Sequence, residues 1–84
     1  MIDNQNNIGQ RIRTARKQKG INQTELANLL GKSLRTIQKY ESGEIEVSIA
    51  MINELAKALD TTSTFLIGYE HDEKNIHSLS DIMD

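Results

Sequence analysis

The sequence contains no cysteine, no proline and no tryptophan among its 84 residues. The absence of cysteine excludes a disulfide framework and a cysteine-ligated zinc or iron–sulfur site. The longest uninterrupted apolar run is only three or four residues, so the sequence contains no membrane span and no apolar core of a secretory signal. One small domain of this length is too short to enclose the deep cleft of most enzymes. We therefore expect a soluble cytoplasmic protein that is not an enzyme, needs no cofactor and binds neither a membrane nor a small-molecule substrate.

The net charge of −2 conceals an uneven distribution along the chain. Residues 8–43 carry eight basic and two acidic side chains, a balance of +6, whereas residues 44–84 carry two basic and nine acidic ones, a balance of −7. Asp3 supplies the remaining charge. A basic front half is typical of a surface that binds a polyanion, although two ordinary solvated faces would give the same count.

Apolar residues recur at intervals of three and four along five segments, and no segment alternates with a period of two. This pattern predicts an all-α fold of five short helices without a sheet. The second helix is expected over residues 23–30 and the third up to about Ser42. The expected helix starts are capped by Asn7, Asn22, Ser33, Ser48 and Thr62 or Ser63, and the expected glycine ends are Gly20, Gly31, Gly43 and Gly68.

The helices are too short to be stable alone, so their stability must come from burial of the apolar side of each one. The residues predicted to face the core are Ile8, Ile12, Ala15, Leu26, Ala27, Leu30, Ile37, Tyr40, Ile49, Ile52, Leu55, Ala56, Leu59, Phe65, Leu66 and Ile67. Arg11 and Arg13 of the first helix are expected to lie in solvent, with contact to a phosphate group of a polyanion as the alternative.

Residues 23–40 carry the pattern of two short helices that meet through a tight turn. A small residue, Ala27, permits close approach of the helices, and Gly31 tolerates the positive φ that the turn needs. Ile37 and Tyr40 are then placed to pack the second of these helices against the first. These offsets favour a helix-turn-helix over the alternative of a generic helical hairpin.

The sequence from Ile8 to Gly68 resembles the Xre-type helix-turn-helix family of phage repressors, Cro proteins and related bacterial regulators. The matching stretches are IGQRIRTARKQKGINQTELA, SLRTIQKYESGE, SIAMINELAKAL and TFLIG. The resemblance implies a five-helix lambda-repressor-like domain whose third helix enters the major groove of double-stranded DNA. It also implies a homodimer that binds a palindromic operator.

The resemblance also assigns residues to the DNA interface, and side-chain chemistry suits the assignments. Arg35 and Lys39 suit the acceptors of guanine, Gln38 suits the edge of adenine, and Leu34 suits a thymine methyl group. The expected base-contacting residues are Ser33, Leu34, Arg35, Gln38 and Lys39, and the expected phosphate-contacting residues are Asn22, Gln23 and Thr36. Arg16 and Glu41 match a family pair that bridges the first and third helices, and we expect a structural ion pair between them.

Four features depart from the family pattern. Lys32 stands where an apolar residue is common. The loop after the third helix reads EIEV, and its two glutamates would repel a DNA backbone, which makes dimerisation more necessary. Val47 replaces the usual proline before the fourth helix. Asp60 stands where the family has a glycine, and aspartate tolerates positive φ better than most residues.

The ends of the chain fall outside the resemblance. Residues 1–7 are interpreted as a flexible arm. Residues 69–84 are interpreted as an acidic tail, a linker or a dimerisation segment, because Ile76, Leu79, Ile82 and Met83 recur at near-helical spacing. His71 and His77 lie in a polar stretch without further ligands, so no metal site is expected.

The sequence therefore predicts a DNA-binding transcriptional regulator, most simply a phage or prophage-type repressor. A restriction–modification controller or an antitoxin of the same fold would share these features. A helical protein-interaction module is the alternative from another class, and it would use the acidic back half and the EIEV loop.

Overall fold

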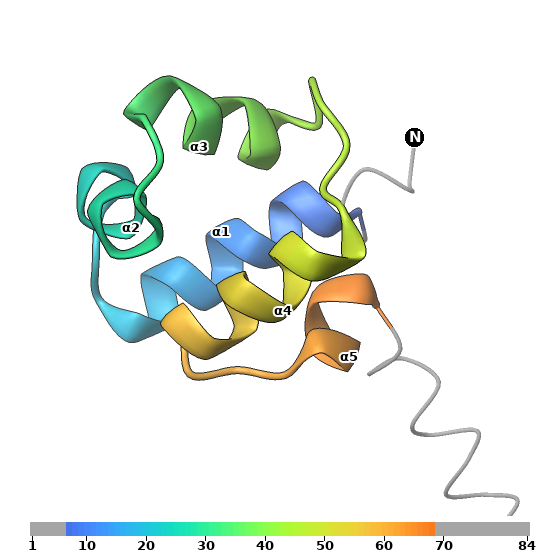
Figure 1. Cartoon of the computed structure of the whole chain (residues 1–84). Coiled ribbons are helices and arrows are strands. Elements are labelled where there is room, and N and C mark those ends of the chain that lie inside the picture. The colour runs from blue at the N-terminus through green and yellow to red at the C-terminus, as the bar shows by residue number, and fades with distance from the viewer. Residues whose placement is uncertain (1–6, 69–84) are drawn as a thin grey trace, which may run out of the picture.

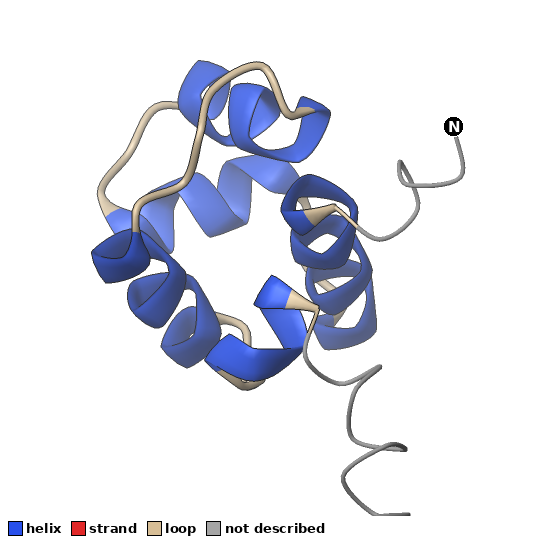
Figure 2. Cartoon of the chain, turned by 90° about the vertical axis from the view of Figure 1, so that its right-hand side faces the viewer, coloured by secondary structure: helices blue, strands red, loops and turns tan. Residues whose placement is uncertain are grey.

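The computed structural model describes residues 7–68, and every secondary-structure element in this part of the chain is a helix (Figures 1 and 2). The elements are α1 (Ile8–Lys19), α2 (Gln23–Leu30), α3 (Leu34–Ser42), α4 (Ile49–Ala58) and α5 (Ser63–Ile67). The predicted all-α fold of five helices is confirmed. The predicted tail at 69–84, with both histidines, lies outside the described residues, as do residues 1–6 of the predicted arm.

The helix boundaries arise from short-range hydrogen bonds. Each N-cap side chain accepts a hydrogen bond from the backbone N–H three residues later, and the caps are Asn7, Asn22, Ser33, Ser48 and Thr62. Four helices end at a left-handed glycine, as expected. The exception is α4, where Asp60 adopts a φ of 56° and is the one non-glycine residue with positive φ among residues 7–68.

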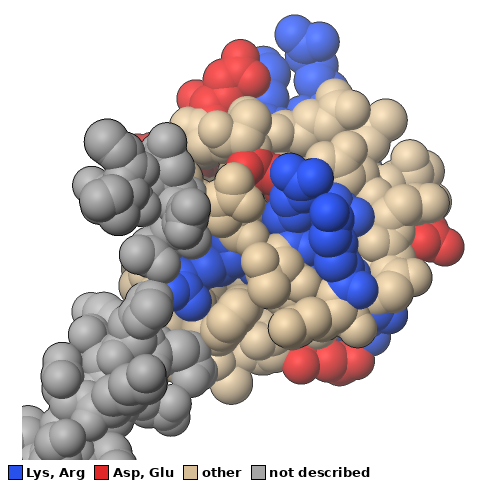
Figure 3. All heavy atoms as spheres, turned by 180° about the vertical axis from the view of Figure 1, so that it is seen from behind, with Lys and Arg blue, Asp and Glu red and all other residues tan. Residues whose placement is uncertain are grey.

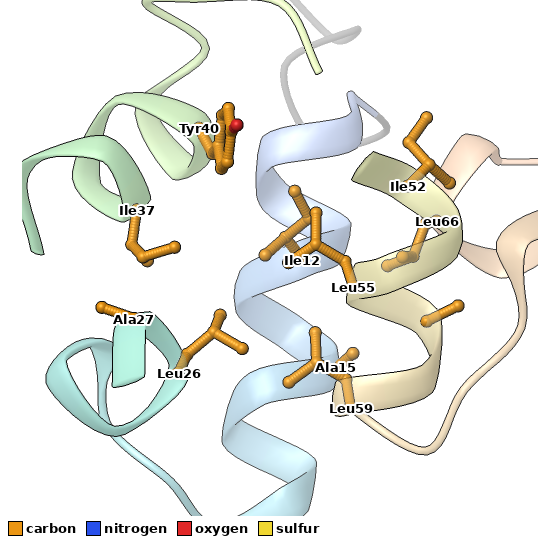
Figure 4. Close-up of a cluster of buried hydrophobic side chains, with 11 residues drawn as sticks. Ile12, Ala15, Leu26, Ala27, Ile37, Tyr40, Ile52, Leu55, Leu59 and Leu66 are labelled. Carbon is orange, nitrogen blue, oxygen red and sulfur yellow. The ribbon is translucent and has the colours of Figure 1, made fainter. Parts of the chain in front are cut away.

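The helices pack in a closed ring around one core. α1 packs against α3 and α5, α2 packs against α3 and α4, and α4 packs against α5. Figure 4 shows the buried side chains of these helices converging on the space that the ring encloses. Each helix contributes one large side chain that is entirely buried, and these are Ile12, Leu26, Ile37, Leu55 and Leu66. Burial of such aliphatic side chains is the main favourable contribution to folding.

The structure corrects two expectations about individual side chains. Ile49 was expected in the core, but it is 69% exposed because it opens α4, where the first turn extends past the core. Arg11 was expected in solvent, but it is 8% exposed. Its guanidinium lies 5.2 Å from the centre of the Phe65 ring and donates to the Phe65 carbonyl oxygen at 3.2 Å, so it joins α1 to α5.

α1 approaches the backbone at the end of α3 closely at Gly9. A Cβ atom at this position would lie 2.5 Å from the Glu41 carbonyl oxygen and 2.6 Å from that of Tyr40. These distances are shorter than any van der Waals contact, and the obstructing atoms are backbone. Glycine at this position therefore sets the distance between α1 and α3, a role that the sequence analysis did not assign to it.

Candidate nucleic-acid interface

The connection between α2 and α3 is a tight turn whose geometry is built by backbone hydrogen bonds. Gly31 ends α2 with a φ of 67°, and the Lys32 N–H donates to the Ala27 carbonyl oxygen at 2.9 Å. Left-handed backbone of this kind costs glycine nothing, whereas a Cβ would strain it. Ala27 itself is 2% exposed, and its small side chain lies where α2 meets α3. α3 begins at Leu34, three residues after Gly31, so this short turn sets the direction of α3 relative to that of α2.

α3 has one face toward the protein and one toward solvent. Ile37 and Tyr40 are buried against α1 and α2, as Figure 4 shows. The other face carries Leu34, which is 40% exposed, with Arg35 and Gln38 exposed and Lys39 partly exposed. Residues 34 and 38, and residues 35 and 39, are one helical turn apart, so the four side chains share one face.

Arg16 and Glu41 form a bidentate ion pair between α1 and α3. Arg16 Nε donates to Glu41 Oε2 at 2.6 Å, and Arg16 Nη2 donates to Oε1 at 3.1 Å. The two side chains are only 10% and 5% exposed. The remaining nitrogen, Nη1, donates to the Ile21 carbonyl oxygen at 3.1 Å, so the guanidinium also holds the chain entering α2.

Gln23 extends this network to α2. Its amide Nε2 donates to Glu41 Oε1 at 3.0 Å, a hydrogen bond that the sequence analysis missed because the residues are 18 positions apart. Glu41 thereby links α1, α2 and α3, and fixes how α3 is presented. An amide nitrogen has two hydrogens, so Gln23 retains a second donor beside the one that Glu41 occupies.

The start of α2 is held by reciprocal capping. Asn22 Oδ1 accepts from the Glu25 N–H at 2.7 Å, and Glu25 Oε1 accepts from the Asn22 N–H at 2.8 Å. At the start of α3, Ser33 Oγ accepts from the Thr36 N–H at 3.1 Å and shares a hydrogen bond of 3.0 Å with Thr36 Oγ1. Asn22, Ser33 and Thr36, which the family resemblance assigns to DNA contact, therefore also close helix ends.

A shallow hollow of about 340 Å³ lies between α1, the start of α2 and the second half of α3. Its lining residues are Arg13, Arg16, Gln23, Gln38, Glu41 and Ser42. Arg13 is exposed and brings a positive charge to the rim of this hollow. Figure 3 shows Lys and Arg side chains gathered near the centre and upper edge of the face seen from behind. The described residues thus combine a polar hollow with the exposed face of α3.

Acidic residues border this region after α3 ends. Glu44 and Glu46 are exposed in the loop between α3 and α4, and Ile45 between them is 39% exposed. A phosphate backbone passing the end of α3 would meet these carboxylates. The departure from the family pattern noted in the sequence is therefore present at the surface.

Comparison with known proteins identifies the fold. A family model described as helix-turn-helix matches residues 12–66, which is well over half of the chain. The chain belongs to the Xre-type helix-turn-helix family. A further match is an uncharacterized HTH-type transcriptional regulator of Sinorhizobium fredii, 33% identical over 58 residues that cover 69% of this chain and 41% of that protein. The chain spans less than half the length of the first curated helix-turn-helix relatives that it matches, and only 16% of one from Pyrococcus furiosus.

Two solved helix-turn-helix structures superimpose on this chain. The restriction-modification controller protein C.AhdI from Aeromonas hydrophila has a TM-score of 0.67 at 38% identity, and the match covers 71% of this chain and 87% of that one. The P22 c2 repressor, solved in complex with a synthetic operator, has a TM-score of 0.66 at 33% identity, with 73% and 92% covered. The fold is that of DNA-binding transcription regulators.

Two other features are absent from the described part of the chain. No helix between residues 7 and 68 is long and apolar enough to cross a membrane. The same residues contain no group of three or more His, Asp or Glu side chains placed to hold a metal ion.

Proposed function

We propose that this helix-turn-helix domain is the operator-binding part of a sequence-specific transcriptional repressor of phage or prophage type. The observation that carries the proposal is the outward face of α3, where Leu34, Arg35, Gln38 and Lys39 lie together while Ile37 and Tyr40 anchor the helix from behind. An α-helix fits the major groove, where base edges are distinguishable. The similarity to a repressor solved on its operator supports the same placement.

The exposed face of α3 offers three kinds of base contact. Arg35 is a bidentate donor to the O6 and N7 atoms of guanine, and Lys39 is a single donor to the same acceptors. Gln38 pairs with the edge of adenine, and Leu34 contacts a thymine methyl group. Neither Arg35 nor Lys39 forms an ion pair within residues 7–68, so base contact breaks no internal salt bridge there. Ser33 adds a hydroxyl at the start of the helix.

Phosphate contacts come from the hollow beside α3. Helix geometry leaves the N–H groups of Gln23 and Thr24 without an intrahelical acceptor, and the positive end of the α2 dipole favours an anion there. The second side-chain amide hydrogen of Gln23 and the side-chain Nδ2 of Asn22 donate to the same phosphate. Arg13 lines the hollow from α1, and Thr36, which lies on α3 outside the lining, is proposed as a further phosphate neighbour. These contacts orient the protein without reading sequence.

A homodimer on a palindromic operator completes the proposal. Glu44 and Glu46 repel the backbone near the end of α3, so a single domain gains less from phosphate contact than the basic side of α1 to α3 suggests. Two domains related by two-fold symmetry would read half-sites about 34 Å apart, or a multiple of that distance.

The deciding experiment selects bound sites from random DNA duplexes and then measures affinity for the selected site. Arg35→Ala should relax the preference at one base pair of each half-site, by roughly 1–3 kcal/mol, whereas Gln23→Ala should weaken binding to all sequences alike. If Arg35→Ala leaves both the selected site and its affinity unchanged, α3 does not read the groove as assigned. The affinity for DNA should also be measured at several salt concentrations. If log affinity does not fall linearly with log salt concentration, a protein-interaction module is favoured instead.

A restriction–modification controller is the second candidate. The similarity to C.AhdI, at 38% identity, favours it. Both candidates predict operator binding by a dimer and differ in the genes that the operator controls. Mapping the selected site onto the host genome therefore distinguishes them, because a controller's site lies beside restriction and modification genes.

A further inference from the structure

An apolar groove of about 590 Å³ lies away from the exposed face of α3. It is formed where the start of α1, the loop between α3 and α4, and the end of α5 come together, at the side of the molecule drawn on the right in Figure 1. Four aliphatic side chains line it, and these are Ile8, Ile45, Val47 and Ile67. Ile45 is 39% exposed and the other three are partly exposed. Aliphatic surface gathered in a groove is typical of a site that another apolar segment covers.

The chain itself continues from the wall of this groove. Ile67 ends α5, Gly68 follows, and sixteen further residues, 69–84, lie outside the described part. Within them the apolar residues Ile76, Leu79, Ile82 and Met83 share a near-helical spacing. Seven residues separate Gly68 from Ile76, about the length of an ordinary connection between helices. This apolar segment is therefore within reach of the groove.

Charge favours a return of the chain to the same side of the domain. Glu46 is the acidic residue in the groove lining, and Lys74 is the basic residue just before the apolar segment.

We propose that residues 76–83 bind in this groove of their own chain. The groove supplies the apolar surface, the preceding seven residues supply the reach, and Glu46 of the groove and Lys74 carry opposite charges. The occupant is thus the same molecule rather than a second copy or another protein. The groove and the exposed face of α3 share no lining residue, so both sites can be filled at once.

Paramagnetic labelling of the full chain tests this directly. Because the protein has no cysteine, Ser80→Cys provides a unique attachment point for a nitroxide label. Binding of the segment should broaden the amide resonances of Ile8, Ile45 and Val47 most strongly, with an effect that falls along α1 toward Lys19, about 16 Å away. Equal broadening at both ends of α1, or none, would overturn the proposal.

Matched variants separate groove binding from other causes. In the labelled chain, Ile45→Asp or Leu79→Asp should abolish the broadening, whereas Ile49→Asp should leave it, since Ile49 is 69% exposed and does not line the groove. A mixture of labelled chains and isotope-enriched unlabelled chains should show no broadening. Broadening in that mixture would mean that the segment occupies a second copy, which refutes the intramolecular contact. The samples contain no DNA, so the result is independent of the proposed function.

Discussion

Glu41 is the residue whose removal should test the architecture most severely. Its carboxylate accepts three hydrogen bonds, at 2.6 and 3.1 Å from Arg16 and at 3.0 Å from Gln23. Glu41→Ala leaves the Arg16 guanidinium 10% exposed with its charge unpaired. Breaking one side of a buried ion pair costs about 3–5 kcal/mol. A core of this size supplies roughly 3–5 kcal/mol of net stability, so the variant should be largely unfolded or close to it.

Milder variants keep the measurement possible. Glu41→Gln removes the charge but retains an acceptor, and should lose about 1.5–3 kcal/mol, since hydrogen bonds to charged groups contribute that much. Gln23→Ala removes one donor of three and should lose about 1 kcal/mol. Urea unfolding followed by far-ultraviolet circular dichroism gives the free energies, and DNA affinity should fall more in Glu41→Ala than in Glu41→Gln. Loss of less than about 1 kcal/mol in Glu41→Ala would refute the ion-pair reasoning.

The double variant provides the sharper control. Replacing both partners, Arg16→Met with Glu41→Leu, removes the unpaired charge and leaves apolar side chains of similar size. Such replacements are often neutral or stabilising, so the double variant should be more stable than Glu41→Ala alone. If the losses of unfolding free energy in the single variants Arg16→Met and Glu41→Leu add up to the loss in the double variant, the cost does not come from an unpaired charge.

The remaining predictions concern packing, salt dependence and backbone strain. Gly9→Ala should lower stability by about 1–3 kcal/mol because its Cβ would lie 2.5 Å from backbone, and a stabilised variant would disprove the close approach. Arg13→Ala should reduce the slope of log affinity against log salt by about 0.9, the value for one phosphate contact, whereas exposed Lys17→Ala should not. Asp60→Val should lower the urea midpoint, by about 1–2 kcal/mol in free energy, while Asp60→Gly stays within about 0.5 kcal/mol, because φ is 56° at this position.

The sequence determined the helix ends well because capping is a short-range effect. Asn22 and Glu25, three residues apart, close the start of α2 wherever that helix packs. The tolerance of Asp60 for positive φ was expected on the same local grounds. Ile49 shows the limit of periodicity, since the apolar spacing continues into the first turn of α4 although the core does not.

Periodicity and local pattern could not predict contacts between distant residues, and only the family resemblance indicated one, between Arg16 and Glu41. Arg11 and Phe65 are 54 positions apart, and Lys19 and Asp60, which form an ion pair, are 41 apart. Neither pair leaves a periodic or local signal in the sequence, and basic residues on a first helix are ordinarily expected in solvent.

Gly9, in contrast, did leave a signal in the sequence. A glycine costs about 0.5–1 kcal/mol inside a helix, and Gly9 lies three residues before Ile12 on the buried side of α1. Such a glycine indicates close approach of another backbone.

The fold also changes what the charge count means for binding. Of the eight basic residues between 8 and 43, Arg11 and Arg16 are buried and act within the protein. The six other basic residues remain at least partly exposed. Glu41 is buried together with Arg16, so Glu25 is the exposed acidic residue of α1 to α3. Burial therefore removes two positive charges and one negative charge, and the exposed surface of α1 to α3 keeps most of its positive balance. A polyanion responds to this exposed balance, because buried pairs contribute little field outside the protein.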